Sequence, residues 1–271
     1  MATCYRHPNR ETGVSCSNCG KPICPDCMTP TPVGMRCPDC SKQRTQTRTL
    51  QSLTVEPIVT YVLIALNVLI YIGVQSTDWA YWQLVLFGEG AFNVQGVGIV
   101  DGVAEGSYWR LLTTGFLHTE IWHIALNMLA LYWLGRMIEP ALGHVRYAGI
   151  YFTSLLTGSL VVLLMQPDVR TLGASGAVYG LLGAAIVMAR NRNIDLVQSG
   201  LLPILGLNFV ITLLFGFSLA AHVGGLLGGL LVTYIIEELD RRRGNTTVPA
   251  VAVCVLVSAA AIAGSIFAVS S

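Results

Sequence analysis

Residues 196–236 carry the sequence LVQSGLLPILGLNFVITLLFGFSLAAHVGGLLGGLLVTYII, which contains no Asp, Glu, Lys or Arg. This stretch is too long for one membrane crossing, because about 20 mostly apolar residues are enough to span roughly 30 Å of hydrocarbon. Gly216, Phe217 and Ser218 interrupt it, and a glycine-containing turn can reverse the chain between two helices. The stretch therefore predicts two consecutive transmembrane helices.

Apolar runs of similar length recur along most of the chain, in which 53% of the residues are hydrophobic and 11% are charged. Soluble globular domains have roughly 25% charged residues, so this composition indicates a membrane protein. Charge-free runs of the required length predict seven transmembrane helices and hence an all-α membrane fold. The predicted spans are residues 57–74, 118–137, 147–166, 172–189, 196–215, 218–236 and 247–269.

The basic residues between these spans indicate the orientation, because Lys and Arg accumulate on cytosolic loops. With a cytosolic start, the loops on that side carry Arg136, Arg146, Arg190, Arg192 and Arg241 to Arg243. Arg110 and Arg170 then lie outside, and the loop at 75–117 is extracytoplasmic. We expect a cytosolic N-terminus, because no signal peptide is evident, and a bacterial plasma membrane, because no organelle-targeting segment is visible. The net charge of +1 gives no reason to expect a nucleic-acid partner.

The first 40 residues hold seven of the eight cysteines. Together with one histidine they form four pairs, and the two-residue gap in each pair lets both side chains reach one metal ion. The candidate ligands are Cys4, His7, Cys16, Cys19, Cys24, Cys27, Cys37 and Cys40. They predict two structural zinc ions, whereas a disulfide framework would go with an exported chain. So short a segment offers little core, and we expect its folding to depend on the metal.

Polar side chains within the predicted spans are candidates for function, because they are costly at membrane depth unless they face a protein interior or a water-filled cavity. His123 and Asn127 are one helical turn apart and project from the same face. Ser175 lies between glycines at the start of the fourth span, where a helix N-terminus offers free N–H donors. His222, near the start of the sixth span, is the available base for its hydroxyl. The topology puts Ser175 and His222 at the extracytoplasmic ends of their helices.

Taken in their order along the chain, these motifs resemble the rhomboid intramembrane proteases. The motifs are Trp109-Arg110, His118 with His123 and Asn127, Gly173-Ala174-Ser175-Gly176 with Tyr179, and Ala221-His222-Val223-Gly224-Gly225. The resemblance covers about residues 57–240 and implies a six-helix rhomboid core. The span at 247–269 is similar to the extra C-terminal helix of some family members.

The resemblance implies a Ser–His dyad that needs no carboxylate and no cofactor. Ser175 would be the nucleophile, and His222 the general base and then the general acid. His123, Asn127 and the Ser175 N–H would form the oxyanion hole, and Tyr179 would pack against the His222 ring.

Other residues receive structural interpretations. Trp109 and Arg110 match a structural motif of the first loop, and His118 is assigned to structural hydrogen bonding. Cys254 is interpreted as a small apolar residue of the last helix. The family's substrate gate involves the fifth helix, but no residue here identifies it.

The cysteine-rich head resembles a B-box zinc finger, although its spacing leaves the ligand pairing open. Cross-bracing, as the resemblance implies, would put one ion on Cys4, His7, Cys24 and Cys27 and the other on Cys16, Cys19, Cys37 and Cys40. Sequential pairing of neighbouring motifs is the alternative. Basic and acidic side chains are balanced in this head, so we interpret it as a regulatory or interaction module that could bind a cytosolic protein.

These observations predict a B-box-like finger at 1–40, a linker at 41–56, the rhomboid core at 57–240, and a cytosolic turn with the seventh helix at 241–271. The expected activity is cleavage of transmembrane protein substrates in the lipid bilayer, from the extracytoplasmic side. A catalytically inactive rhomboid-like factor that binds membrane proteins for quality control is the alternative. A transporter would have polar residues at mid-membrane in many helices, whereas here they gather toward one side.

Overall fold

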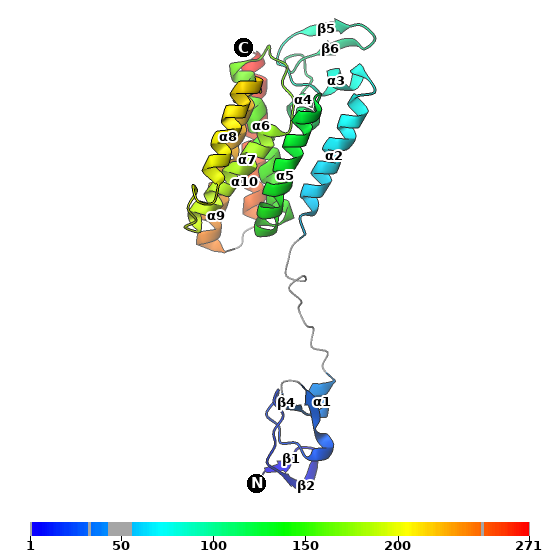
Figure 1. The fold of residues 1–271 in the computed structure, drawn as a ribbon, viewed down its shortest axis with the longest axis vertical. Coiled ribbons are helices and arrows are strands. Elements are labelled where there is room, and N and C mark those ends of the chain that lie inside the picture. The colour runs from blue at the N-terminus through cyan, green and yellow to red at the C-terminus, as the bar shows by residue number, and fades with distance from the viewer. Residues whose placement is uncertain (1, 32–33, 43–55, 245–246, 271) are drawn as a thin grey trace. The chain divides into compact units, whose positions relative to one another are not determined.

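The computed structural model describes residues 2–31, 34–42, 56–244 and 247–270. The chain divides into two compact units, Met1–Thr54 and Val55–Ser271, and each is described by itself (Figure 1). Of the predicted linker at 41–56, residues 43–55 lie outside the described part of the chain.

The first unit is small and built from short elements. Its elements are β1 (Ala2–Cys4), β2 (His7–Thr12), η1 (Pro25–Cys27), β3 (Thr29–Thr31), β4 (Gly34–Arg36) and α1 (Pro38–Ser41). Strands β1 and β2 form one antiparallel hairpin, and β3 and β4 form another. Ile23 and most of the cysteine side chains make up its buried cluster. A unit of this size with so few buried apolar residues usually needs metal ions or disulfides to fold.

The second unit is a bundle in which the described residues form seven long helices. These are α2 (Ile58–Val74), α5 (Ile121–Leu142), α6 (His144–Met165), α7 (Ser175–Asn191), α8 (Leu201–Phe215), α9 (Leu219–Arg243) and α10 (Thr247–Ser270). They coincide with the seven predicted spans, with ends that differ by several residues. The predicted break between α8 and α9 is confirmed, because Gly216 ends α8 with φ +68° and the Ser218 side chain caps α9.

Length and composition allow three of the described helices, α6, α9 and α10, to cross a membrane. Helices α2 and α8 are shorter apolar helices. The bundle is therefore an all-α membrane fold, as its composition predicts.

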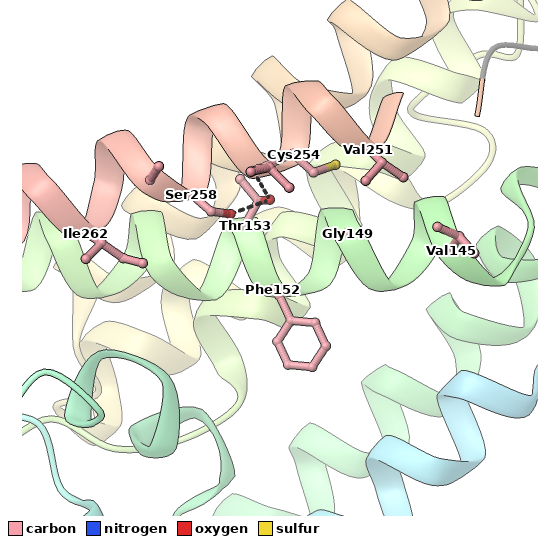
Figure 2. Close-up of a pocket in the computed structure, with 10 residues that line it drawn as sticks. Val145, Gly149, Phe152, Thr153, Val251, Cys254, Ser258 and Ile262 are labelled. Carbon is pink, nitrogen blue, oxygen red and sulfur yellow. Dashed lines mark hydrogen bonds between the residues drawn. The ribbon is translucent and has the colours of Figure 1, made fainter. Parts of the chain in front are cut away.

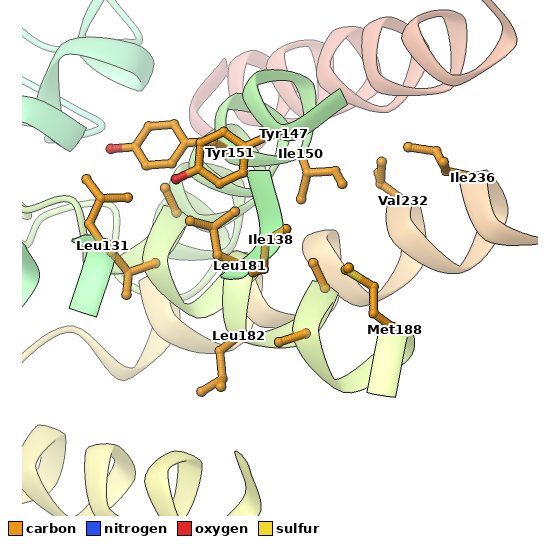
Figure 3. Packing of buried hydrophobic residues seen from close by; sticks show 14 of the residues in the cluster. Leu131, Ile138, Tyr147, Ile150, Tyr151, Leu181, Leu182, Met188, Val232 and Ile236 are labelled. Carbon is orange, nitrogen blue, oxygen red and sulfur yellow. The ribbon is translucent and has the colours of Figure 1, made fainter. Parts of the chain in front are cut away.

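Helix α7 is the centre of this bundle. Almost every residue from Gly176 to Ala189 is buried, and α7 packs against α5, α6 and α9. Figure 3 shows apolar side chains of these helices meeting in one cluster. Its labelled members are Leu131, Ile138, Tyr147, Ile150, Tyr151, Leu181, Leu182, Met188, Val232 and Ile236. By contrast, α8 is peripheral, since only Leu201 and Thr212 of this helix are buried.

Helix α10 lies along α6, away from the predicted catalytic residues. The two helices border a groove of about 390 Å³ lined mainly by apolar side chains (Figure 2). Within it, Thr153 Oγ1 donates to the Cys254 carbonyl at 3.2 Å and lies 3.0 Å from Ser258 Oγ. Cys254 is buried in this contact, as expected for a small apolar residue of the last helix.

The loop between α2 and α5 is ordered around one arginine. It contains α3 (Asp78–Leu84), the hairpin β5 (Ala91–Val94) and β6 (Gly98–Asp101), α4 (Arg110–Thr113) and η3 (Thr114–Phe116). The buried Arg110 guanidinium donates to the carbonyls of Asp101, Trp82 and Val85 and lies over the Phe87 ring. Burial lowers the pKa of Arg110 to about 10, so the group stays charged at neutral pH. The Trp109-Arg110 motif thus has the structural role that the resemblance implies, whereas the hairpin was not predicted.

Candidate active site

Ser175 is the first residue of α7, and the first N–H groups of a helix have no partner within the helix. Gly173 precedes it with φ +120°, a backbone conformation that residues with side chains rarely adopt. This glycine lets the chain turn sharply into the helix and leaves space beside the serine hydroxyl. Ser175 Oγ lies 2.7 Å from His222 Nε2, which is hydrogen-bond distance.

His222 lies in the first turn of α9, which starts after the cap residue Ser218. His222 is 3% exposed, and its ring stacks on the Tyr179 ring, with centroids 4.1 Å apart and an angle of 10° between the planes. Tyr179 thus packs against the imidazole as the resemblance implies. This stacking limits rotation of the imidazole and keeps Nε2 directed at Ser175.

The close approach of α7 and α9 brings the serine and the histidine together. A Cβ atom at Gly225 would lie 1.9 Å from the Gly176 carbonyl oxygen, and one at Gly229 would lie 2.0 Å from that of Gly180. Only glycine fits such contacts between backbones. The glycines of α9 therefore set the distance between the helices that carry the two reactive groups.

His123, on α5, borders the same space. A Cβ atom at Gly173 would lie 2.7 Å from His123 Nε2 and 3.8 Å from Ser175 Oγ, so both groups surround one small volume. The Phe217 ring stacks on His123 with centroids 4.8 Å apart. A ring nitrogen of His123 therefore lies near the serine, and the glycine at position 173 places no side chain between them.

Asn127 connects to this site through its neighbours. Its Nδ2 lies 3.2 Å from His118 Nε2 and donates to the His123 carbonyl at 3.1 Å. The backbone N–H of Ala174 also points to His118 Nε2, at 3.4 Å. His118 thus ties the start of α5 to the segment before Ser175, which agrees with the structural role assigned to it.

One residue of this site was missed by sequence reasoning. Thr212, on α8, has its hydroxyl 2.8 Å from His222 Nδ1, where a serine protease triad has a carboxylate. The available signal was a pair of polar residues, Asn208 and Thr212, one turn apart in an otherwise apolar helix. That signal was weak, because a threonine hydroxyl in such a helix can bond its own backbone.

The arrangement suits nucleophilic chemistry. A hydroxyl at a helix N-terminus faces an imidazole nitrogen that can remove its proton. Backbone N–H groups of α7 and the His123 ring surround the space where a reacting oxygen could sit. The structure brings together Ser175, His222 and His123, and it links Asn127 to them through His118 and the His123 backbone.

The first unit holds a second chemical feature, two groups of four side chains that could bind metal ions. One group is Cys4, His7, Cys24 and Cys27, and the other is Cys16, Cys19, Cys37 and Cys40. Within each group the ligand atoms all lie within 4.8 Å of one another. Cys24 Sγ lies 3.3 Å from His7 Nδ1, and Cys19 Sγ lies 3.8 Å from Cys37 Sγ. Tetrahedral zinc with Zn–S bonds of about 2.3 Å puts its ligands roughly 3.8 Å apart, so both donor sets fit this ion.

Backbone N–H groups lower the pKa of two thiols in the second group, Cys16 and Cys37. The Cys37 N–H points to Cys16 Sγ at 3.3 Å, and this interaction lowers the pKa of Cys16 to about 6. The Cys40 N–H, 3.4 Å from Cys37 Sγ, lowers the pKa of Cys37 as well. Because a metal binds the deprotonated sulfur, these contacts favour binding at Cys16 and Cys37. The Asn18 amide lowers the pKa of Cys40, but the Cys37 side chain and burial outweigh it and raise this pKa to about 11.

Comparison with known proteins agrees with the geometry of the bundle. Residues 105–238 match the family model of the Rhomboid domain. This range contains Ser175, His222, His123 and Asn127, and it excludes both the cysteine-rich unit and α10.

Several curated proteins are similar to this chain. Rhomboid protease GluP of Bacillus subtilis (strain 168) is 32% identical over 189 residues, which cover 64% of this chain and 34% of that protein. Putative rhomboid protease YdcA of the same organism is 28% identical over 193 residues, covering 69% of this chain and 92% of that protein. RHOMBOID-like protein 7 of Arabidopsis thaliana is 34% identical over 141 residues, covering 49% of this chain and 44% of that protein.

The chain thus spans about a third of GluP and most of YdcA, with 34% and 92% of their lengths covered. The domain match and these relatives support the rhomboid family for this all-α membrane protein.

Proposed function

We propose that this chain is an intramembrane serine endopeptidase that cleaves transmembrane segments of membrane proteins with a Ser175–His222 dyad. The observation that carries the proposal is the 2.7 Å contact between Ser175 Oγ and His222 Nε2 at the N-terminus of a buried helix. The rhomboid domain match and the similarity to proteins named rhomboid proteases support it.

In this mechanism Ser175 Oγ attacks the carbonyl carbon of the scissile peptide bond while its proton passes to His222 Nε2. The imidazolium then gives this proton to the nitrogen of the leaving amine as the peptide bond breaks. A water molecule, deprotonated by His222, hydrolyses the acyl-enzyme and restores the serine. The reaction needs no cofactor.

The oxyanion of the tetrahedral intermediate needs donors close to Ser175. The Ser175 N–H, in the unpaired first turn of α7, supplies one, and the His123 ring supplies another. The Asn127 amide faces His118 Nε2 and the His123 carbonyl in the resting site. It contributes to the oxyanion hole by exchanging the contact with His118 for one with the charged oxygen.

The orientation follows from the basic residues of the loops. A cytosolic N-terminus puts the N-terminal ends of α7 and α9, and therefore the dyad, toward the extracytoplasmic side. We place the protein in a bacterial plasma membrane, with single-span membrane proteins as substrates that reach the dyad from the bilayer.

The first unit is proposed to bind two structural zinc ions. The cross-braced arrangement, with Cys4, His7, Cys24 and Cys27 on one ion, is supported by the two compact donor sets. Such a B-box-like finger would present a surface for a cytosolic protein.

Turnover of a single-span model substrate by the purified full-length chain tests the proposed activity. Ser175→Ala and His222→Ala should each lower turnover by at least about 1000-fold, because the dyad acts as one unit. Ser199→Ala, at an exposed serine, is the matched control and should keep full turnover. A fluorophosphonate probe should label the wild type and the Ser199 variant but not the Ser175 variant.

Undiminished turnover in both dyad variants would contradict the mechanism. A wild-type chain that neither turns over substrates nor reacts with the probe would instead favour the inactive, membrane-protein-binding alternative.

A further inference from the structure

The Thr212 hydroxyl has three polar neighbours although it belongs to the most exposed helix of the bundle. Thr212 is 2% exposed, and its Oγ1 lies 2.8 Å from His222 Nδ1 and 3.2 Å from the Tyr179 hydroxyl. The third neighbour is the Asn208 carbonyl oxygen in the preceding turn of α8, at 2.8 Å. These neighbours belong to three helices, α7, α8 and α9.

Counting protons determines the direction of each of these hydrogen bonds. A threonine hydroxyl has one proton to donate and two lone pairs to accept with. The Asn208 carbonyl can only accept, so the proton of Thr212 must point to it. The two lone pairs then accept from the Tyr179 O–H and from His222 Nδ1–H. If Thr212 donated its proton elsewhere, its oxygen and the Asn208 carbonyl oxygen would face each other as two acceptors at 2.8 Å. If Nδ1 carried no proton, its lone pair would face a lone pair of Thr212 Oγ1 at 2.8 Å.

We infer that Thr212 is a positioning residue for the reaction: its hydroxyl holds His222 in the tautomer with the proton on Nδ1, so that the free electron pair of Nε2 faces Ser175. The inference rests on the proposed function, because only a general base needs this tautomer. It assigns to a neutral hydroxyl the place that a carboxylate takes in a catalytic triad.

The same hydrogen bond persists through the reaction. When the Ser175 proton moves to Nε2, the ring becomes a cation with protons on both nitrogens. Thr212 Oγ1 still accepts from Nδ1–H and keeps the ring in plane for transfer of the Nε2 proton to the leaving amine. Thr212 neither gains nor loses a proton, and its bond to the Asn208 carbonyl is unchanged.

The test compares four variants of the full-length chain in detergent micelles, using the single-span substrate. Thr212→Val keeps the shape and removes the hydroxyl, Thr212→Ser restores it, and Val210→Thr is a matched change at an exposed position of α8. Tyr179→Phe removes one donor to Thr212 but keeps the ring that stacks on His222.

We expect Thr212→Val to lower kcat about tenfold to a hundredfold with KM unchanged, because one buried hydrogen bond to the base is lost. Thr212→Ser should recover kcat to within about threefold of the wild type. Val210→Thr should leave kcat and KM unchanged. Tyr179→Phe should have a smaller effect than Thr212→Val, because the bond to Nδ1 remains.

Nitrogen NMR of the chain with labelled histidines reports the tautomer directly, and the His222 signals are those lost in His222→Ala. The wild type should show His222 protonated on Nδ1, and Thr212→Val should show both tautomers. This spectrum of the wild type also serves as the test if the valine variant does not fold.

A wild-type His222 protonated on Nε2, or a Thr212→Val variant that folds with unchanged kcat, would overturn the inference. A Thr212→Ser variant as slow as Thr212→Val would overturn it as well. These outcomes differ from failure of the proposed function, in which the wild type itself has no turnover that depends on Ser175.

Discussion

Glu139 has a carboxylate with no exposed surface, close to the end of α5 opposite the catalytic residues. Its oxygens accept from the backbone N–H groups of Val59 and Thr60 at 2.8 Å and from the Thr60 hydroxyl at 2.6 Å. His144 Nδ1 lies 2.6 Å from the same carboxylate. The first N–H groups of α2 have no partner within the helix, and the negatively charged Glu139 carboxylate accepts their hydrogen bonds. One residue of α5 therefore connects α5 to α2. The run of apolar residues in α2 gave no sign of this partner.

Glu139→Gln should therefore destabilise the bundle. The amide NH₂ replaces an acceptor and faces N–H donors of α2, so we expect a loss of about 2 to 4 kcal/mol in the free energy of unfolding. Thermal unfolding in micelles measures this change. Glu120→Gln, at an exposed residue just before α5, is the control and should stay within about 0.5 kcal/mol of the wild type. Equal melting temperatures for both variants would contradict the proposed capping.

Among the helices, α7 and α8 represent opposite kinds of packing. Helix α7 is surrounded by apolar side chains and by the backbone of α9, whereas α8 leaves most of its apolar surface free. Two glycines, Gly225 of α9 packed against α7 and Gly206 within α8, show the same contrast. A Cβ atom at Gly225 would meet the α7 backbone at 1.9 Å, and one at Gly206 would meet nothing within 4 Å.

Alanine at these two glycines should change stability in opposite directions. Gly225→Ala should lower the free energy of unfolding by about 3 kcal/mol or more and reduce turnover, because α9 and His222 must move away from Ser175. Gly206→Ala should raise stability by about 0.5 to 1 kcal/mol, because alanine loses less backbone freedom in a helix. Chemical unfolding of both variants, with turnover measured alongside, checks this. A tolerated alanine at Gly225 would contradict the close contact.

At the scale of the whole molecule, the chain consists of a cysteine-rich unit and a helical bundle with different sources of stability. The bundle buries apolar side chains, whereas the small unit has a core made mostly of candidate metal ligands. The spacing of the cysteine pairs was compatible with two ways of sharing two ions. The folded unit favours the cross-braced one, because each compact donor set draws on pairs that are not neighbours in sequence.

Zinc content of double variants distinguishes the two pairings. Cys4→Ser with Cys24→Ser should keep one zinc ion per chain, because cross-bracing puts both residues on the same ion. Cys4→Ser with Cys16→Ser should bind none, because it damages both sites. The wild type should bind two ions. Elemental analysis of the purified full-length chain measures all three, and sequential pairing would exchange the results of the two double variants.

Much of the bundle could be predicted because its determinants are local. Each of these determinants can be interpreted from one segment of the chain: the apolar runs indicate helices, the break at Gly216 a turn, and the loop arginines the cytosolic side. The bilayer sets the length that a helix must have to cross it. The motifs around Ser175, His123 and His222 could also be recognised, although whether their side chains meet could not. The hairpin β5–β6 was missed, because it lies in a long loop whose conformation depends on Arg110 and its distant carbonyl partners.

The sequence by itself determined that the chain is a helical membrane protein with a cysteine-rich head, and it singled out a serine, two histidines and an asparagine as catalytic candidates. Only the tertiary structure decided that the serine and His222 lie at hydrogen-bond distance, that Glu139 caps α2, and that the Thr212 hydroxyl lies 2.8 Å from His222 Nδ1. The physical reason is that a helix pattern reports which residues avoid water, an energy summed over many side chains. Whether side chains of two helices form a hydrogen bond depends instead on differences of a few tenths of an ångström in the distance between their atoms. The packing of segments that are distant in sequence sets that distance.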